Sequence, residues 1–447
     1  MMLHDTLDTT ILSLGKATVD SPMTRMGDDS ISKFFVSDNE RVLLSVNPFD
    51  IKERLKSNAD IVSFELAGPR EKIYFDPSKL RCALVTCGGL CPGLNDIIRS
   101  IVLQLYYRYG VRNIYGIQYG LQGFIPEYGH DVIDMNPGNV VNIHERGGTI
   151  LGSSRGPQDI EKVVDCLERM NIGILFMIGG DGTQMAASKI ADTVIQRGLK
   201  ISVVGVPKTI DNDIYLVAKS FGFDTAVDVA TTAIEGAHNE AQGYHNGIGL
   251  IKFMGRHSGF LAATAALAKQ DVNFVLIPEV NFDLDGPEGL LASLKDRLLS
   301  RKHAVIVVAE GAGQNLFTGG HTERDASGNV KLHDIGIFLR DKITHYFQSI
   351  NMEISLKYID PSYMIRSLPA NANDHVFCSF LGRDAVHAGM AGKTKLLIGH
   401  WNNHYVHIPM DLSVGKRKQV APYGKLWLTV LEATGQGSLL NKPPAGK

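Results

Sequence analysis

The stretch Ile-Gly-Ile-Leu-Phe-Met-Ile at 172–178, followed by Gly-Gly-Asp-Gly-Thr at 179–183, decides the fold of this chain. The first seven residues are an apolar run of strand length, and a helix-length stretch, Gln184–Arg197, follows the glycines. A second apolar run, Ile201–Val206, comes next. An apolar run, a glycine-rich turn, a helix and another apolar run predict a βαβ unit, whose two strands pair in parallel and are covered on both faces.

The same alternation of strand-length and helix-length stretches continues on both sides of this unit. Apolar runs recur at Cys82–Cys87, Asn113–Ile117, Ile248–Phe253, Asn273–Ile277 and Ala304–Ala309. With 447 residues, and about 150 residues to a typical domain, the chain is long enough for two or three domains. We therefore expect an α/β fold of two doubly wound parallel-sheet lobes with the active site between them, plus an N-terminal extension over residues 1–78.

Composition and charge set limits on the class of protein. The formal net charge is −2, so we expect no binding to nucleic acid or to an anionic membrane, and any affinity for phosphate must come from local groups. The five cysteines are too few and too irregularly spaced for a disulfide framework or a zinc site, so we expect free thiols. The sequence shows neither a signal-peptide pattern nor an apolar run of about 18 residues, and we expect a cytoplasmic protein.

Glycine-rich or charged segments directly follow the apolar runs. They are Gly88-Gly89, Gly179–Thr183, Pro207–Asp213, Met254-Gly255-Arg256 and Glu310-Gly311. In parallel α/β sheets ligands bind beyond the carboxyl ends of the strands, so these segments are expected to converge on one cleft. Turns between strands and helices are often polar in any case, which accounts for the glycines but not for the concentration of Asp, Arg and Lys.

Three glycine-rich segments predict a site for a phosphate donor. Gly88-Gly89 precedes a helix expected over Asn95–Tyr109, whose N-terminal N–H groups attract phosphate. Gly147–Gly156 holds a guanidinium, Arg155, that suits polyphosphate and the charge on a moving phosphoryl group. Asp181 is a carboxylate set among glycines, and it suits Mg²⁺ held between this carboxylate and phosphate oxygens.

A competing phosphate loop occurs near the C-terminal end. Ala391-Gly392-Lys393-Thr394 resembles the end of a nucleotide-binding P-loop. His387 stands where that motif needs its first glycine, and the preceding residues are typical of a helix rather than a strand. We therefore exclude this segment as a phosphate site.

The segment Pro207-Lys208-Thr209-Ile210-Asp211-Asn212-Asp213 carries a second chemical pattern. If it is extended, Thr209, Asp211 and Asp213 point to the same side and line one wall of the cleft. One carboxylate can then accept a proton from an attacking alcohol, with a typical gain of about 10²–10⁴ in rate, and the other can help to hold a metal. The alternative is an Asx-rich surface turn.

Groups suited to a phosphorylated acceptor lie farther along the chain. Arg256 in Met254-Gly255-Arg256 and Arg366 in Tyr363-Met364-Ile365-Arg366 supply guanidiniums for bidentate phosphate capture. Glu279 and Glu310 follow apolar runs and have carboxylates that suit sugar hydroxyls. Each of these residues is by itself equally consistent with a surface charge, so their meaning depends on the whole set.

Taken in order over residues 80–405, these segments resemble the phosphofructokinase family, in its atypical ATP-dependent branch, which is close to the pyrophosphate-dependent group. The matching elements are Gly88-Gly89 with Pro92–Asn95, Gly-Gly-Asp-Gly-Thr, Pro-Lys-Thr-Ile-Asp-Asn-Asp, Met-Gly-Arg, Glu310 and Tyr363–Arg366. The resemblance implies a glycolytic 6-phosphofructokinase, which uses Mg-ATP to phosphorylate the 1-hydroxyl of fructose 6-phosphate. It also implies a homodimer or homotetramer in which a neighbouring subunit completes the sugar-phosphate site, with Lys357 as the candidate cation.

The resemblance also implies a role for each candidate residue. Asp211 is the general base, Thr209 and Arg155 lie beside the transferring phosphoryl group, and Asp181 binds Mg²⁺, with Asp213 as a further candidate. The residues that border ATP are Gly88, Gly89, Arg155, Gly156, Gly180, Asp181, Gly182 and Thr183. The residues that bind fructose 6-phosphate are Thr209, Ile210, Asp211, Met254, Gly255, Arg256, Glu310, Tyr363, Met364, Ile365 and Arg366.

The lobes follow from these roles. We expect a nucleotide-binding lobe over residues 79–215 plus about 365–405, and a sugar-phosphate-binding lobe over residues 216–364. Residues 406–447 are expected to form a C-terminal segment.

Gly182 and Lys208 bear on the identity of the donor. In pyrophosphate-dependent relatives the residue that matches Gly182 is typically aspartate and the one that matches Lys208 is lysine, so this chain has a mixed pattern. A carboxylate at 182 would clash with and repel the α-phosphate region of ATP, whereas Lys208 suits either donor. ATP is the expected donor and pyrophosphate the nearest alternative. A non-catalytic regulatory subunit and a lipid or NAD kinase are remote alternatives, and the last would share only the Gly-Gly-Asp-Gly string.

Overall fold

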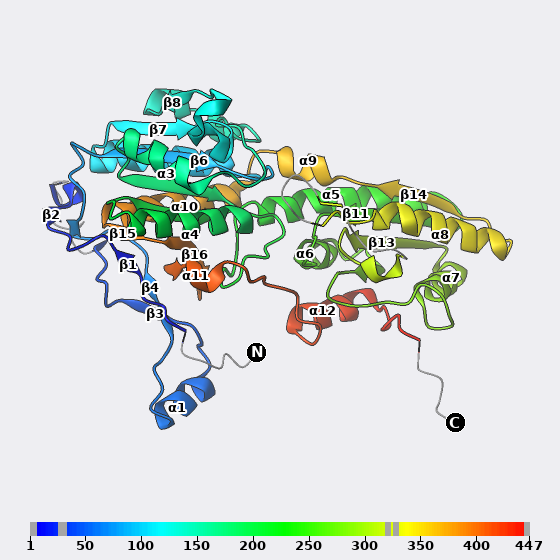
Figure 1. The fold of residues 1–447 in the computed structure, drawn as a ribbon. Coiled ribbons are helices and arrows are strands. Elements are labelled where there is room, and N and C mark those ends of the chain that lie inside the picture. The colour runs from blue at the N-terminus through cyan, green and yellow to red at the C-terminus, as the bar shows by residue number, and fades with distance from the viewer. Residues whose placement is uncertain (1–6, 26–33, 318–322, 325–329, 442–447) are drawn as a thin grey trace. The chain divides into compact units, whose positions relative to one another are not determined.

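The computed structural model describes residues 7–25, 34–317, 323–324 and 330–441. These residues fall into two units, which are considered separately (Figure 1). Unit 1 comprises residues 1–209, 214–222 and 367–417, and unit 2 comprises residues 210–213, 223–366 and 418–447. One crossing between the units lies within a segment that the sequence singled out, between Thr209 and Ile210, and two others lie at the ends of such segments, after Asp213 and after Arg366.

Unit 1 is built on a nine-stranded sheet in the order β3-β4-β17-β16-β10-β9-β6-β7-β8. Its strands are β3 (Arg41–Leu43), β4 (Ser63–Leu66), β6 (Arg81–Thr86), β7 (Asn113–Ile117), β8 (Val132–Asp134), β9 (Ile174–Gly179), β10 (Ser202–Pro207), β16 (Leu396–Trp401) and β17 (His404–Pro409). Strands β16, β10, β9, β6 and β7 are parallel, which confirms the expected α/β fold.

Helices cover both faces of this sheet. The covering helices are α2 (Leu94–Leu103) with its π-helical continuation η3 (Gln104–Tyr109), α3 (Ile160–Arg169), α4 (Asp181–Gln196), α10 (Ala372–Met390) and α11 (Met410–Ser413). Helix α1 (Pro48–Lys56) has no buried residue and lies apart from the sheet (Figure 1). Leu175 and Met177 of β9 pack in one cluster with residues of α3 and α4. Ile174 and Phe176, which alternate with them, meet α10 at Gly389. The central strands are therefore continuous apolar runs, because both of their faces are buried.

Short single turns of 3₁₀ helix connect these elements. They are η1 (Pro22–Arg25), η4 (Gly120–Phe124), η5 (Pro126–Tyr128), η6 (Pro137–Val140) and η7 (Ile143–Glu145) in unit 1, and η8 (Gln314–Leu316) in unit 2.

The described part of residues 1–78 shares the core of unit 1. Strands β3 and β4 extend the large sheet through β17, while β1 (Leu12–Ser13) pairs with β15 (Lys393–Thr394) and β2 (Val19–Asp20) pairs with β5 (Lys72–Ile73). Phe64 is completely buried and packs in one cluster with Val406 and Ile408 of β17. The segment therefore depends on residues more than 300 positions away for its burial.

Glu65 on β4 lies at the centre of a buried ion network. Its carboxylate is 2.9 Å from Arg70 Nη2, 3.3 Å from Lys393 Nζ and 2.9 Å from His407 Nδ1. Asp38 also contacts both cations, at 2.8 Å from Arg70 Nε and 2.9 Å from Lys393 Nζ. Lys393 is thus held by carboxylates and only 9% exposed, which supports its exclusion as a P-loop lysine.

Unit 2 is built on a four-stranded parallel sheet in the order β12-β13-β11-β14. Its strands are β11 (Gly247–Phe253), β12 (Phe274–Leu276), β13 (His303–Ala309) and β14 (Ser355–Ile359). Its helices are α5 (Phe223–Gln242), α6 (Phe260–Lys269), α7 (Leu290–Arg301), α8 (Ile335–Ser349), α9 (Ser362–Ser367) and α12 (Lys425–Thr434). Gly249 of β11 lies against Ala237 of α5, whereas Ile248 and Leu250 pack in one cluster with α7 and α8. This sheet is therefore also covered on both faces.

The C-terminal residues divide between the units. Strand β17 and α11 complete unit 1, and residues 418–441 return to unit 2, where α12 packs against α6 and β12. Gln436 holds this return in place, because its side-chain oxygen accepts a hydrogen bond from Val275 N at 2.6 Å.

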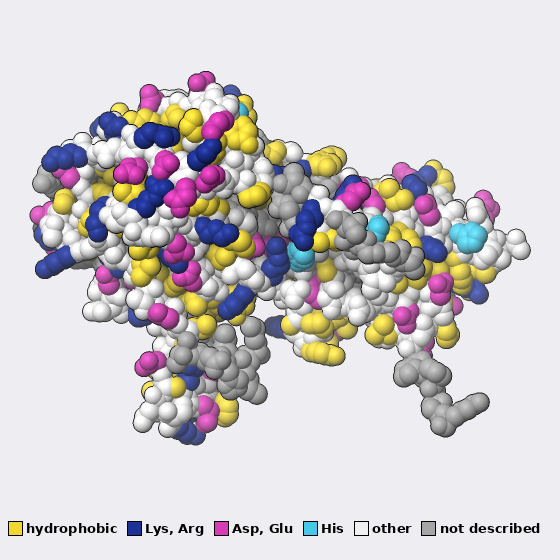
Figure 2. Space-filling model, in the orientation of Figure 1, with side chains coloured by type: hydrophobic (Ala, Val, Ile, Leu, Met, Phe, Trp, Pro, Cys, Tyr) yellow, Lys and Arg dark blue, Asp and Glu magenta, His cyan; other side chains and the backbone are white. Residues whose placement is uncertain are grey.

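All five cysteines are free thiols, and burial raises the pKa of Cys87 to about 12. On the face of unit 1 seen in Figure 2, acidic and basic side chains are intermingled. Among the described residues, no helix combines the length and the apolar character needed to cross a membrane.

The Glu65 network predicts a large loss of stability on removal of one charge. Glu65→Gln is expected to lower the free energy of unfolding by about 3 kcal/mol, because Arg70 and Lys393 then share a single carboxylate in a buried site. The matched control is Glu53→Gln, which breaks the exposed pair with Lys56 and should change stability by no more than about 0.5 kcal/mol. Chemical denaturation of the three proteins measures both values, and equal losses would contradict the prediction.

The same network predicts acid sensitivity. Burial alone would raise the pKa of Glu65, but the hydrogen bond and charge of His407, with the charges of Lys393 and Arg70, lower it overall. A lowered carboxyl pKa contributes stability that is present above the ordinary value of 4.5 and is lost as the pH falls. The parent protein should therefore lose stability more steeply below pH 4.5 than Glu65→Gln does, and denaturation midpoints measured across this range test the difference.

Candidate active site

The carboxyl ends of three parallel strands lie side by side in unit 1. Thr86 at the end of β6 pairs with Ile178 of β9, and Pro207 at the end of β10 pairs with Gly179. Backbone hydrogen bonds continue past these ends, from Cys87 N to Ile178 O at 2.9 Å and from Lys208 N to Gly179 O at 3.0 Å. The turns that follow the three strands are therefore adjacent, as the sequence pattern predicted for this part of the site.

The Gly88-Gly89 turn is joined to two other predicted segments. Gly88 has a φ of 84°, which favours glycine, and its N–H donates to Ser154 O at 3.1 Å. Ser153 Oγ donates to Gly88 O at 2.6 Å, and Lys208 Nζ donates to Gly89 O at 2.6 Å. These bonds bring together the two glycine-rich loops and Lys208. Arg155, which follows Ser154, is exposed.

Asp181 occupies the first turn of α4. The helix begins at Asp181, and Thr183 N and Gln184 N both donate to Gly180 O. The Asp181 side chain is 18% exposed, and Arg417 Nη2 lies 3.6 Å from its Oδ2.

Asp181 suits a magnesium site in which phosphate oxygens supply most of the ligands. The described residues contain no cluster of three or more His, Cys, Asp or Glu side chains that could hold a metal ion. Magnesium commonly takes only one or two protein carboxylates and completes its shell with phosphate and water. A single partly exposed carboxylate at a helix N-terminus, where phosphate also binds, has the chemistry that such a site needs.

The protein itself does not require glycine at position 182. A Cβ atom there would meet nothing within 4 Å, the residue is exposed, and its φ is not positive. Gly179 differs, because a Cβ at 179 would lie 2.2 Å from Thr183 Oγ1. A glycine in the first turn of a helix that neither packing nor backbone conformation requires is consistent with the close approach of a ligand.

The segment from Thr209 to Asp213 is not extended, so the condition for Thr209, Asp211 and Asp213 to point to the same side is not met. Ile210 and Asp211 lie in a bend, and Asn212 has a φ of 53°, which is the left-handed conformation that asparagine tolerates. The alternation of side chains therefore cannot be used to place the two carboxylates. Within unit 2 the turn is fixed at its backbone, because Ser258 Oγ donates to Asp211 O at 3.1 Å and Lys418 N donates to Asp213 O at 2.8 Å.

Arg256 and Glu310 are brought together at the strand ends of unit 2. Phe253 at the end of β11 pairs with Ala309 at the end of β13, and Gly311 N donates to Gly255 O at 3.1 Å. Burial raises the pKa of Glu310, and the positive charge of Arg256 opposes this effect. The Arg256 guanidinium also donates a hydrogen bond to Val330 O.

Helix α9 carries the remaining predicted acceptor residues. Arg366 stacks on Tyr363, with 4.6 Å between the guanidinium carbon and the ring centroid. Tyr363 and Met364 are 73% and 70% exposed. The Ile365 side chain is completely buried, so this residue holds α9 to the unit and offers only its backbone to a ligand.

Two further candidates, Glu279 and Lys357, make contacts within unit 2. Both carboxylate oxygens of Glu279 accept hydrogen bonds from Gly259 N at 3.0 Å, and one of them also accepts from Val420 N at 2.8 Å. Lys357 on β14 is exposed and lies over the ring of Tyr244, with 5.0 Å between Nζ and the centroid.

Sequence reasoning missed three cations next to the predicted segments. Arg417 lies beside Asp181 in unit 1. In unit 2, Lys418 lies beside Asp213, and burial lowers its pKa to about 8 against the opposing charge of that aspartate. Lys252 precedes Met254 on β11 and binds two aspartates. The basic run Lys416-Arg417-Lys418 was the available signal for two of them, whereas nothing in the sequence around Lys252 distinguishes it from an ordinary strand residue.

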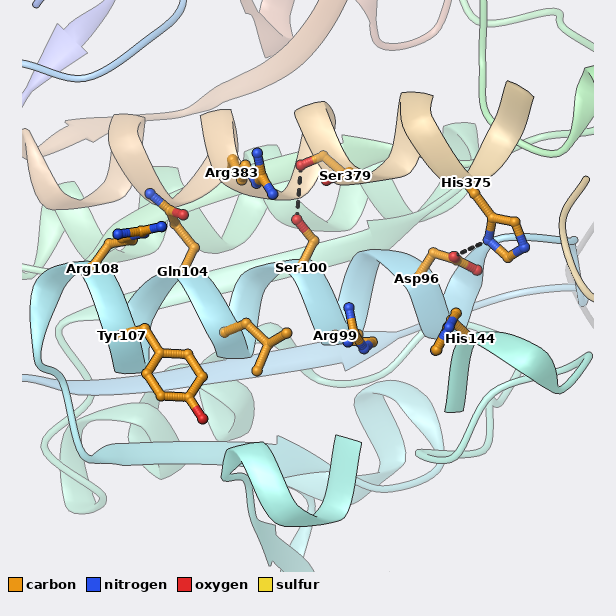
Figure 3. A pocket seen from close by; sticks show the side chains of 11 residues that line it. Asp96, Arg99, Ser100, Gln104, Tyr107, Arg108, His144, His375, Ser379 and Arg383 are labelled. Atoms are coloured by element: carbon orange, nitrogen blue, oxygen red, sulfur yellow. Dashed lines mark hydrogen bonds and ion pairs between the residues drawn. The ribbon is translucent and has the colours of Figure 1, made fainter. Parts of the chain in front are cut away.

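A separate cavity of roughly 570 Å³ lies in unit 1 between α2 and α10 (Figure 3). Asp96 on α2 contacts His375 on α10, and Ser100 Oγ donates to Ser379 O at 2.8 Å. The lining has three arginines and two histidines against one aspartate, so it is rich in positive charge. None of the predicted site residues lines it.

The chain is similar to known proteins in sequence and in fold. A family model described as phosphofructokinase matches residues 81–389. The chain is 51% identical over 439 residues to the ATP-dependent 6-phosphofructokinase of Borreliella burgdorferi, covering 97% of this chain and 98% of that protein. It is 45% identical over 436 residues to the ATP-dependent 6-phosphofructokinase of Amycolatopsis methanolica, covering 96% and 95%.

The fold is also similar to that of a solved structure. The pyrophosphate-dependent phosphofructokinase of Marinobacter aquaeolei matches with a TM-score of 0.65 and 20% identity, covering 81% of this chain and 93% of that one. At this level of identity the similarity concerns the fold and does not distinguish between phosphoryl donors.

The loops that carry Arg256 and Glu310 pack so closely that one added methyl group at position 311 should destabilise the protein. A Cβ at position 311 would lie 2.0 Å from Arg256 O, so Gly311→Ala is expected to lower the free energy of unfolding by about 1–3 kcal/mol. The matched control is Gly236→Ala on α5, where a Cβ meets nothing within 4 Å and alanine should stabilise the helix by about 0.5–1 kcal/mol. Differential scanning calorimetry of both variants tests the contrast, and a neutral Gly311→Ala would contradict the packing argument.

Proposed function

Because the chain belongs to the phosphofructokinase family, we propose that it transfers the γ-phosphoryl group of ATP to the 1-hydroxyl of fructose 6-phosphate, which gives fructose 1,6-bisphosphate. The observation that carries this proposal is the identity of 45–51% to ATP-dependent 6-phosphofructokinases over nearly the whole chain. The presence of Asp181, Asp211 and Arg256 in the matching motifs supports an active enzyme over a non-catalytic subunit.

Gly182 is the residue that selects ATP as the donor. The space around its α-carbon is open, so ATP can approach the start of α4 without meeting a side chain or a negative charge. Lys208 adds positive charge at the Gly88-Gly89 turn, where its ammonium group donates to Gly89 O, and this charge suits ATP and pyrophosphate alike.

Residues at the strand ends of unit 1 bind the phosphates. The backbone of Gly88, Gly180, Gly182 and Thr183 borders ATP, and Arg155 balances the negative charge that spreads over the transferred group. Asp181 would hold Mg²⁺ together with the phosphates of ATP, and the bound metal would neutralise part of their charge.

Asp211 is the general base. Its carboxylate accepts the proton of the 1-hydroxyl as the oxygen of that hydroxyl forms a bond to the γ-phosphorus. The bond from the γ-phosphorus to the bridging oxygen breaks, and ADP leaves with the electron pair. The hydrogen bond from Ser258 to the Asp211 backbone supports this role, because a base must be held in one position.

Residues at the strand ends of unit 2 recognise the sugar phosphate. Arg256 and Arg366 bind the 6-phosphate, and Glu310 accepts hydrogen bonds from sugar hydroxyls. The exposure of Tyr363 and Met364 supports a contact surface on α9. We further propose a cytoplasmic homodimer or homotetramer, in which Lys357 extends to the sugar phosphate of a neighbouring subunit.

If Gly182 selects the donor, a negative charge placed at position 182 should lower the activity with ATP. Gly182→Asp should lower kcat/KM for ATP by at least about 100-fold, because a like charge faces the phosphates, with less harm to any use of pyrophosphate. Gly182→Ala is the control and should keep ATP activity, since position 182 has room for a methyl group. Steady-state assays with each donor test this, and a parent enzyme that uses pyrophosphate but not ATP would overturn the donor assignment.

The role of Asp211 predicts a loss of turnover. Asp211→Ser should lower kcat by at least about 10²-fold, because the 1-hydroxyl loses its base. The control, Asp341→Ser, changes an exposed carboxylate on α8 and should leave kcat unchanged. An Asp211→Ser enzyme with the parent turnover would remove this residue from the role of base.

A further inference from the structure

Lys252 on β11 is a partly buried cation to which the proposed reaction gives no role. Its side chain is 12% exposed, and its Nζ lies 2.9 Å from Asp334 Oδ2 and 2.9 Å from Asp360 Oδ2. Burying a lysine with two carboxylates costs desolvation energy that an apolar side chain would not cost. The arrangement therefore calls for an explanation beyond packing.

Asp360 connects Lys252 to the helix that carries the acceptor residues. One of its carboxylate oxygens lies at Lys252, and the other accepts hydrogen bonds from Ser362 N at 3.1 Å and from the Ser362 hydroxyl. Ser362 is the first residue of α9, which also holds Tyr363 and Arg366. A strand of the central sheet is thus tied to the start of α9 through one carboxylate.

Asp334 connects Lys252 to a different helix. Its Oδ2 lies at Lys252, and its Oδ1 accepts a hydrogen bond from Ile337 N at 3.1 Å, which caps the N-terminus of α8. No residue of α8 is among the predicted site residues. Of the two carboxylates that hold Lys252, Asp360 therefore contacts a helix with proposed site residues, α9, and Asp334 contacts a helix without any, α8.

Lys252 also acts on Glu310 through its charge. Burial raises the pKa of Glu310, and the charges of Arg256 and Lys252 oppose this rise. The charge of Lys252 thus favours the ionised form of Glu310, the carboxylate that is proposed to accept hydrogen bonds from the sugar.

We propose that Lys252 is a positioning residue for the phosphorylated acceptor. Through Asp360 it fixes the start of α9, and with it the direction in which Tyr363 and Arg366 meet the sugar phosphate. The inference rests on the proposed function, because that function makes α9 part of the acceptor site. Supporting residues of this kind leave the reacting groups in place and change how well they are oriented.

Lys252→Met removes the charge and keeps an unbranched side chain of similar length. KM for fructose 6-phosphate should rise by about 10-fold, the size of effect typical when a supporting contact is lost, while KM for ATP changes by less than about two-fold. Calorimetric titration of fructose 6-phosphate without ATP should show the same weakening. The matched control is Lys269→Met, which removes the partly exposed pair with Glu235 in the same unit and should leave both KM values unchanged.

Two aspartate variants separate the route through α9 from a general loss of stability. Asp360→Asn and Asp334→Asn make the same chemical change, and the asparagine side-chain oxygen can still accept the backbone hydrogen bond in each case. Asp360→Asn should reproduce the rise in KM for fructose 6-phosphate, whereas Asp334→Asn should not. This pair also decides the question if Lys252→Met does not fold.

The outcomes distinguish this inference from the proposed function. Equal effects of the two aspartate variants, or a lowered melting temperature with an unchanged KM in Lys252→Met and Asp360→Asn, would make Lys252 a structural residue and overturn the inference alone. A parent enzyme that neither phosphorylates nor binds fructose 6-phosphate would overturn the proposed function and the inference with it.

Discussion

The parallel register of the central strands is the constraint on which the remaining structure depends. Parallel neighbours end at the same edge of a sheet, so the loops that follow them must be adjacent, however far apart they lie in the chain. In unit 1 the pairing of Pro207 with Gly179 places Lys208 beside the start of α4. In unit 2 the pairing of Phe253 with Ala309 does the same for Arg256 and Glu310. Each unit therefore gathers polar groups at one edge, while its central strands are mainly apolar.

Glycines at these edges serve different physical purposes. Gly88 supplies a positive φ, and Gly311 allows two loops to approach within a distance that a methyl group would prevent. Gly182 has neither reason to be glycine, since its surroundings are open and its φ is negative. This contrast separates glycines that the fold requires from Gly182, which it does not require and which we propose as the residue that selects the donor.

Buried charges connect segments that are distant in the sequence. Glu65 joins the N-terminal strands to Lys393 and His407, and its contacts are explained by the assembly of the sheet in unit 1. Lys252 joins β11 to the starts of two helices. Charges of this kind specify one arrangement, because a slipped arrangement would leave a buried charge without its partner.

Much of this protein can be predicted from its sequence, because local pattern carries the information. The apolar runs predicted the central strands within one or two residues, since burial on both faces leaves a continuous signal. The motifs around Asp181 and Arg256 could likewise be identified from the sequence, because glycines and charged residues directly follow those apolar runs.

Tertiary structure alone decided the features that depend on distant partners. The sequence suggested an extended segment through Asp211, but Asn212 is left-handed, and such a conformation is fixed by contacts of the backbone with residues such as Ser258 and Lys418. The position of Arg417 beside Asp181 and the two aspartates around Lys252 were also invisible in the sequence. Strand and turn patterns extend over a few residues, whereas the pairing of a charge depends on which distant segments the fold brings within about 4 Å of it.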